Sequence, residues 1–208
     1  ERVQFVFNQK GTKLDLSDCN IDDACAVALA KVLPHFTQLQ QLHLEENQIE
    51  DSDAIAIVNS IINLTELQQL VLRSNKIGDT GAITLANTIS NLTGLQELHL
   101  SGNEIGDTGA IAIAIANSIT NLTQLQALYF FDNQIGYTGT TAIANSITNL
   151  IQLRWVNLSY NEIDDTGAIT IANSIRNLTQ LQLLGLHNNR IGDIGAIAIA
   201  NSIKHLTQ

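Results

Sequence analysis

Short Gly-rich turns are the motifs in this 208-residue sequence that most resemble a reactive centre. Residues 78–81 read Gly-Asp-Thr-Gly, and the backbone N–H groups of such a turn can cradle a phosphate. Near-copies stand at residues 106–109, 136–139 and 192–195. Because one catalytic centre needs one such turn, four copies indicate a repeated structural element. The acidic pairs at residues 22–23 and 164–165 lie in equivalent turns, and we interpret them as helix starts favoured by the helix dipole.

The histidines, cysteines and serines do not combine into a metal or hydrolytic site. His43 and His99 occupy equivalent positions two predicted strands apart, which separates them by roughly 10 Å, too far for one zinc ion. His99 and Ser101 share one strand face, but no buried carboxylate and no oxyanion donors accompany them. The two cysteines, Cys19 and Cys25, favour free thiols in a reducing compartment. We therefore predict no catalytic residue, no metal and no cofactor.

The charge balance restricts the partners of the chain. Twenty acidic and ten basic residues give a net charge of -10, which opposes binding to nucleic acid and to anionic lipid. The apolar runs are shorter than the roughly 18 residues that a membrane span requires. We expect a protein partner that is basic or has an apolar patch, no nucleic acid and no membrane span.

One pattern, Leu-x-x-Leu-x-Leu-x-x-Asn-x-Ile, organises nearly the whole chain. It first appears in full from Leu39 to Ile49. Its asparagine recurs at Asn47, Asn75, Asn103, Asn133, Asn161 and Asn189. A degenerate copy with Cys19 in place of the asparagine precedes these, which makes seven repeats of 28 residues, with two extra residues before Asn133.

Alternation within each copy predicts a short strand. Leu98 and Leu100 then point into a core, while Glu97 and His99 point outward. The strands stack as a parallel sheet, and the Asn side chain is expected to bond backbone groups that the turn leaves unpaired, forming a ladder.

A helix follows each turn. Its apolar residues fall at helical spacing, and we predict Asp79 as the N-cap of one such helix. Residues 111–116 alternate as in a strand, yet the phase of the repeat predicts a helix there, extended, bulged or offset by the two extra residues.

The pattern resembles the leucine-rich repeat family, and its 28-residue unit with Gly-Asp-x-Gly-Ala resembles the ribonuclease-inhibitor-like subtype. The resemblance implies an α/β fold: a curved solenoid with parallel strands on the concave face and helices on the convex face. We expect a single domain over residues 1–208, with residues 1–10 (Val3, Phe5 and Phe7 among them) as an N-terminal strand or cap and seven repeats over 11–208. The last repeat stops where another would begin, so we expect a truncated C-terminus.

Members of this subtype include ribonuclease inhibitor, NOD-like receptors, Ran GTPase-activating protein and bacterial effectors. The few cysteines and the uniform unit argue against inhibition of a ribonuclease. The resemblance implies a protein-binding module of a larger intracellular protein, such as a receptor or a bacterial effector, in the cytoplasm or the host cytosol. The alternatives are a GTPase-activating or other enzyme-regulating protein, with Arg73 or Arg154 as the candidate arginine, and an architectural or autoinhibitory array.

Aromatic residues mark the candidate binding site. Six of the nine lie between positions 129 and 160, although the repeat pattern does not require them there. The predicted partner-binding residues are Tyr129, Phe131, Trp155, Tyr160, Arg154, His99, Asn157 and Leu183. We expect Trp155 between Ala127 and Leu183 and Tyr129 between His99 and Asn157, with small neighbours leaving the rings open to a partner. The second candidate surface is acidic and consists of Asp15, Asp18, Glu45 and Glu46.

Overall fold

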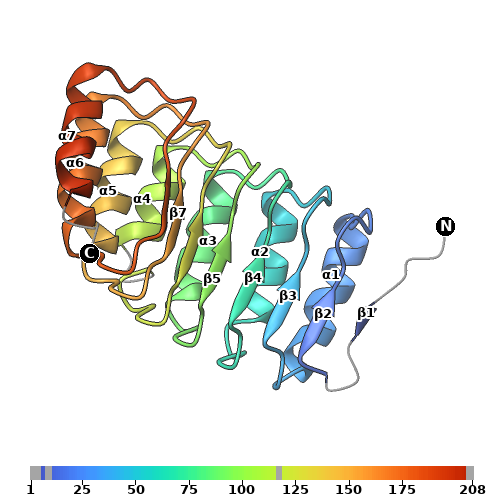
Figure 1. Cartoon of the computed structure of the whole chain (residues 1–208). Helices are drawn as coiled ribbons and strands as arrows, with labels where there is room; N and C mark the ends of the chain where they lie inside the picture. Colours follow the sequence, from blue (N-terminus) through green and yellow to red (C-terminus); the bar gives the residue numbers. More distant parts are fainter. Residues whose placement is uncertain (1–5, 8–10, 116–118, 205–208) are drawn as a thin grey trace.

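The computed structural model describes residues 6–7, 11–115 and 119–204, and it confirms a leucine-rich-repeat solenoid (Figure 1). The strands are β1 (Val6–Phe7), β2 (Lys13–Asp15), β3 (Gln41–His43), β4 (Gln69–Val71), β5 (Glu97–His99), β6 (Ala127–Tyr129), β7 (Trp155–Asn157) and β8 (Leu183–Gly185). The helices are α1 (Asp23–Val32), α2 (Asp51–Ser60), α3 (Asp79–Ile89), α4 (Asp107–Ile115), α5 (Tyr137–Ile147), α6 (Asp165–Ser174) and α7 (Asp193–Ile203), with the short 3-10 helices η1 (Leu33–His35) and η2 (Ile175–Asn177).

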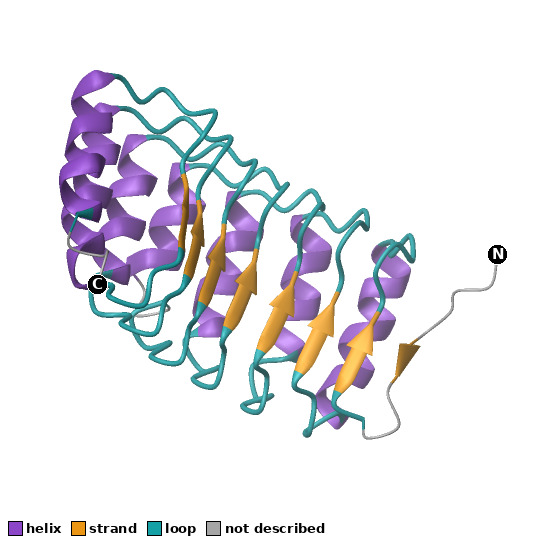
Figure 2. Cartoon of the chain, in the orientation of Figure 1, coloured by secondary structure: helices purple, strands orange, loops and turns teal. Residues whose placement is uncertain are grey.

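The strands form one sheet in chain order, and the helices cover one face of it (Figure 2). Strands β2 to β8 are parallel, and each is paired in register with the next, as Leu70 is with Leu98. Neighbouring strands lie about 4.8 Å apart, whereas packed helices need about 8–10 Å, so the stack curves with its strands on the concave face.

The inward residues of each repeat build one continuous core. Leu98, Leu100 and Ile105 are completely buried, as are the equivalent residues of the neighbouring repeats. Phe130 fills the place of a leucine and is among the largest fully buried side chains. The outward residues of the strands are therefore the ones left for binding.

The predicted asparagine ladder is confirmed. The Nδ2 of Asn103 donates to the carbonyls of Leu72, in the preceding repeat, and of Leu100, in its own repeat, at 3.0 Å each. Its Oδ1 accepts the N–H of Ile77 at 3.1 Å. The same bonds recur at Asn47, Asn75, Asn133, Asn161 and Asn189. One side-chain amide, buried or partly buried, thus joins each turn to the turn before it.

A second ladder joins the helix starts and corrects the predicted N-cap. The N-cap of α3 is Gly78, and Asp79 is the first helical residue. The Oδ1 of Asp79 accepts the N–H groups of Gly106 and Gly109 at 2.8 Å, so it caps α4 in the next repeat. A Cβ on Gly109 would lie 2.8 Å from that oxygen, which explains the glycine. The recurring Gly-Asp-Thr-Gly turn is therefore structural.

Where a helix lacks the aspartate that would cap the next helix, the next helix has its own N-cap side chain. Tyr137 replaces the capping aspartate in the fifth repeat, so α5 offers no carboxylate to α6. The N-cap of α6 is Asp164 instead of the usual glycine, and it accepts the N–H of Gly167 at 2.9 Å. Asp22 caps α1 in the same local way, and α2 is capped locally by Glu50 and Asp53.

Two further expectations concern the ends and the irregular repeat. Residues 111–115 are helical, which confirms the repeat phase over the strand-like composition, while part of the expected irregularity lies outside the described residues. Phe7 belongs to β1, which pairs antiparallel with β2. Val3 and Phe5 lie outside the described residues.

The ladder predicts a specific loss of stability. Asn103→Ala should lower the free energy of unfolding by about 1–3 kcal/mol, because it leaves buried backbone groups unpaired. Asn91→Ala removes an exposed amide just after α3 and should change it by less than about 0.5 kcal/mol. Urea denaturation followed by circular dichroism measures both, and equal midpoints would contradict the role of the ladder.

The second ladder predicts a dependence on pH. Burial acts to raise the pKa of Asp107, but hydrogen bonds from Thr138, Gly139 and Gly136 outweigh it and lower the pKa below 3.8. The ionised form is thus the one that stabilises the fold, above pH 3.8, and the contribution is lost as the pH falls through the lowered pKa. Asp107→Asn should be less stable than the native chain at pH 7, and this difference should shrink at pH 3.

Asp193 provides the matched control, because it is the equivalent residue of α7 and no described helix follows it. The stability of Asp193→Asn should match that of the native chain at both pH values. A deficit of Asp107→Asn that persisted unchanged at pH 3 would contradict the assignment.

Candidate protein-binding site

The outward strand positions place the predicted site residues side by side. Trp155 is registered between Ala127 and Leu183, and Tyr129 between His99 and Asn157, as expected. The outward residues of neighbouring strands therefore form rows across the sheet. They point outward because the residues that alternate with them, such as Leu128 and Val156, are buried in the core.

Five of the outward rings form what we call the aromatic cluster: His99, Tyr129, Phe131, Tyr160 and His187. The rings of His99 and Tyr129 lie 4.4 Å apart between centroids, tilted by 34°. Tyr160 meets Phe131 edge-on at 5.1 Å and His187 edge-on at 5.2 Å. These are favourable aromatic geometries, so the cluster is a preformed surface that spans four repeats.

The expectation that the rings stand open is only partly correct. Tyr160 is 46% exposed and Leu183 is 45% exposed, but Tyr129, Phe131 and Trp155 are partly covered. The rings of the cluster contact one another in two groups, His99 with Tyr129 and Tyr160 with Phe131 and His187, and these contacts reduce the area that each ring offers. Burial and the charge of Glu97 raise the pKa of Tyr129, so its hydroxyl stays protonated and can donate a hydrogen bond.

Tyr160 adopts a backbone conformation that does not suit it. Its φ is 54°, in the left-handed region. The equivalent turn residues, all with positive φ, are Asp18, Glu46, Ser74, Gly102, Asp132 and Asn188. Small or polar residues tolerate this conformation better than a bulky ring does. The conformation of the turn therefore gives no reason for a tyrosine at this position. The reason that we infer is the exposed ring, which is available for binding.

Sequence analysis did not find His187, which completes the aromatic cluster. Its Nδ1 lies 2.8 Å from the Oγ of Ser159 on the adjacent strand. His187 occupies the same repeat position as Phe131 and Ser159, so the phase of the repeat carried the signal. Ser159 has no exposed surface, so this pair is arranged for support and not for attack on a substrate.

A polar chain continues from the cluster across the central strands. Glu97 accepts a hydrogen bond from Gln69 at 2.8 Å and lies 3.0 Å from the Nε2 of His99, a carboxylate partner that sequence analysis did not assign. Gln69 in turn lies 2.9 Å from His43. Ser101 beside His99 is buried, so the arrangement suits recognition more than hydrolysis.

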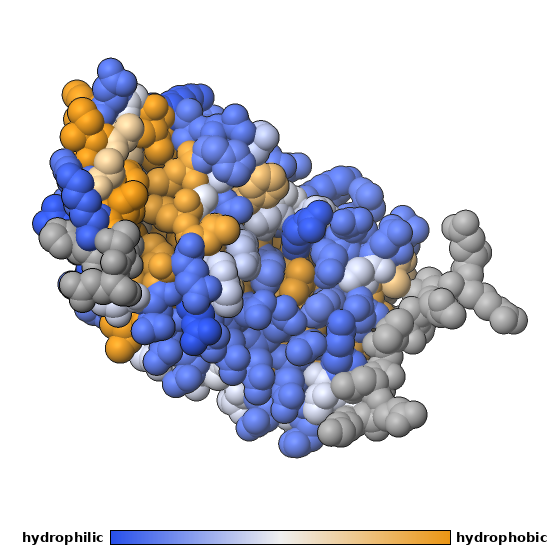
Figure 3. Space-filling view, in the orientation of Figure 1, coloured by the Kyte–Doolittle hydropathy of each residue, from blue (hydrophilic) through white to orange (hydrophobic). Residues whose placement is uncertain are grey.

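Two of the four carboxylates of the acidic surface, those of Asp15 and Glu46, face a cation of the same chain. Burial acts to raise the pKa of Asp15, but Ser17 and Lys13 outweigh it and lower the pKa. Lys13 lies 3.1 Å from Asp15, and Arg73 lies 3.4 Å from Glu46. Figure 3, in the orientation of Figure 1, shows a hydrophilic surface over these repeats and an apolar surface toward the C-terminal end.

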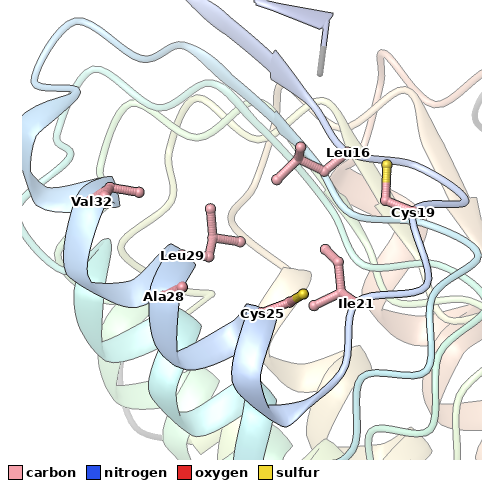
Figure 4. A pocket seen from close by; sticks show the side chains of 7 residues that line it. All are labelled: Leu16, Cys19, Ile21, Cys25, Ala28, Leu29 and Val32. Carbon is pink, nitrogen blue, oxygen red and sulfur yellow. The ribbon is translucent and has the colours of Figure 1, made fainter. Parts of the chain in front are cut away.

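An apolar pocket of about 270 Å³ lies at the open end of the first repeat, between α1 and the turn after β2 (Figure 4). Its lining consists of Leu16, Cys19, Ile21, Cys25, Ala28, Leu29 and Val32. Both cysteines are free thiols, as expected. Burial, with the charges of Asp15 and Asp18, raises the pKa of Cys19, so this thiol is a poor nucleophile.

Metal ligands and membrane-spanning helices can be assessed for residues 6–7, 11–115 and 119–204, which the structure describes. In these ranges no group of three or more His, Cys, Asp or Glu side chains could hold a metal ion. No helix there is long and apolar enough to cross a membrane.

Comparison with known proteins agrees with the repeat pattern. The sequence profile of the family described as "Leucine Rich repeat" matches residues 12–30, 37–58, 63–86, 91–114, 153–172 and 176–200, more than half of the chain. A search of curated protein sequences gives no match. The matched ranges do not include residues 115–152, which contain Tyr129, Phe131 and Tyr137.

Two solved structures illustrate the likeness of the fold. Internalin C2 from Listeria monocytogenes has a TM-score of 0.60 and 19% identity, with 94% of this chain and 77% of that chain covered. Actin-binding site 2 of leiomodin-1 has a TM-score of 0.56 and 16% identity, with 74% of this chain and 88% of that chain covered. At these identities the likeness concerns the fold alone.

The strained turn gives a test that needs no partner. Tyr160→Asn should leave the free energy of unfolding unchanged or raise it by up to about 1 kcal/mol, because relief of the left-handed strain offsets the lost ring contacts. The reverse change in the next repeat, Asn188→Tyr, should lower it by about 1 kcal/mol. Urea titrations measure both, and a loss of more than about 1 kcal/mol in Tyr160→Asn would show that the ring serves the fold.

Proposed function

The chain belongs to the leucine-rich repeat family, and from this premise we propose that it binds a protein partner through its concave face, with the aromatic cluster and Trp155 as the main contacts. Proteins of this family are typically interaction modules. Actin-binding site 2 of leiomodin-1 is a solved example of the fold in a protein-binding segment.

One observation carries the proposal: aromatic side chains are concentrated at outward positions where the repeat does not need them. The outward residues of the third repeat include Gln69, Val71 and Arg73, whereas those of the fifth are Ala127, Tyr129 and Phe131. Tyrosine and tryptophan supply much of the binding energy of protein interfaces. The partly exposed rings, rigidified by contact with one another, suit a contact that loses little side-chain entropy on binding.

The proposal extends to the setting of the module. The uniform 28-residue unit with helices of 9–11 residues supports the ribonuclease-inhibitor-like subtype. We place residues 1–208 in a single domain of a larger intracellular protein, such as a receptor or a bacterial effector, acting in the cytoplasm or the host cytosol. The free thiols of Cys19 and Cys25 favour a reducing compartment.

Truncation of the rings tests the function. Trp155→Ala and Tyr129→Ala should each weaken binding of the partner by about 2 kcal/mol, or roughly 30-fold in Kd, because buried aromatic anchors dominate interfaces. The partner is first identified by affinity purification with the full-length protein and then titrated calorimetrically against each variant. Unfolding in urea should change by less than about 1 kcal/mol, since both side chains are only partly buried.

Gln68→Ala is the control, a partly exposed residue beside β4 and outside the cluster, and it should bind normally. Normal binding by both aromatic variants would contradict the proposal. The acidic surface of Asp15, Asp18, Glu45 and Glu46 would then become the better candidate.

A further inference from the structure

Half of the eight lysine and arginine side chains that the structure describes face a carboxylate, and three of the others are exposed. On the strand side, four cations face carboxylates at 3.1–3.5 Å: Lys13 with Asp15, Arg73 with Glu46, Lys76 with Glu50, and Arg190 with Glu162. On the helix side, Lys31 and Arg176 stand in the last turns of α1 and η2, where the helix dipole favours a cation. Lys204 donates to Asn201 at 3.0 Å.

Arg154 differs from these three exposed cations because it is partly buried. Among the described residues no carboxylate lies within ion-pair distance of it, and it is not at the end of a helix. It immediately precedes β7 and is followed by Trp155. The equivalent residues of five other repeats are Gln40, Gln68, Gln96, Gln126 and Gln182. The repeat therefore accommodates a neutral side chain at this position and does not require an arginine.

The guanidinium also has an unused donor. The side chain is partly buried, and its Nε is shielded from solvent with no hydrogen-bond acceptor within the described chain. A buried donor without an acceptor costs free energy, so such a group calls for an explanation. The Nη groups of Arg154 are not shielded in this way, and the two Nη groups of an arginine form a fork that matches the two oxygens of a carboxylate.

The apolar surroundings narrow the chemistry of the ligand. Trp155 next to Arg154 is registered beside Leu183, which is 45% exposed on the adjacent strand. An apolar side chain can rest on this pair while a neighbouring carboxylate reaches the guanidinium. Building on the proposed function, we infer that Arg154 receives a Glu or Asp carboxylate of the partner, adjacent in the partner to an apolar side chain that contacts Trp155 and Leu183.

Two short peptides that differ in one charge test this inference. The probes are acetyl-Leu-Phe-Glu-amide and acetyl-Leu-Phe-Gln-amide, titrated at low salt into the chain of residues 1–208. Trp155 is the only tryptophan, and the probes contain none, so its fluorescence reports binding at the site. The glutamate peptide should bind about five-fold more tightly than the glutamine peptide, the size expected of a partly exposed ion pair.

Arg154→Gln installs the residue used by the other repeats and should abolish the preference while retaining the fold. Arg73→Gln is matched to it in chemistry and in net charge, and it should keep the preference, because Arg73 is already paired with Glu46. A preference that survives in Arg154→Gln, or is lost in Arg73→Gln, overturns the inference. Equal binding of the two peptides to the native chain overturns it alone and leaves the aromatic surface intact, whereas no response to either counts against the proposed function as well.

Discussion

The asparagine of each repeat is the interaction on which the rest of this structure depends. Its amide bonds the carbonyl of the preceding strand and the N–H that follows the preceding turn, so the relative position of two repeats is set by one buried side chain. With that position fixed, residues of equal phase lie in rows across the sheet. Tyr129 faces His99, and Trp155 faces Leu183, because the ladder and the backbone hydrogen bonds between the strands hold them in register. The binding surface is thus a consequence of how backbone groups are satisfied.

The turn that the ladder stabilises also requires a left-handed backbone conformation, which is unfavourable for a bulky side chain. Each turn places one residue in the left-handed region, and six of the seven use Asp, Glu, Ser, Gly or Asn. Tyr160 is less suited to this conformation than those residues, but its ring contacts Phe131 and His187. Local preference and global fold usually agree, and their disagreement concentrates at functional positions. Backbone strain and aromatic exposure therefore point independently to the same residue.

The architecture could be predicted from the sequence because the position of a residue within its repeat indicates whether it lies in the core, in a turn or on the surface. The sequence predicted the parallel sheet, the ladder and the neighbours of Trp155. It misplaced the role of Asp79, because single-helix capping rules concern local contacts, whereas this carboxylate reaches helix α4 about one repeat later. The mutual covering of the rings and the contribution of His187 depend on side-chain rotamers across strands, which spacing alone does not determine. Likewise, the lack of a carboxylate beside Arg154 among the described residues depends on the three-dimensional positions of the side chains, which the sequence alone does not give.

The two ends of the concave face differ in how fully their polar groups are satisfied, and this difference indicates where a partner gains most. In the first four repeats, His43, Gln69, Glu97 and His99 form a connected chain, and nearby cations face carboxylates, although the Oε2 of Glu45 has no hydrogen-bond partner among the described residues. A partner binding there must compete with bonds already made, so the net gain is small. Around Trp155 and Leu183 the surface is apolar, and the one cation beside it, Arg154, has an unused donor. A partner that binds there removes apolar surface from water and can place a carboxylate beside Arg154 without breaking an existing ion pair, so the later repeats are where association gains the most free energy.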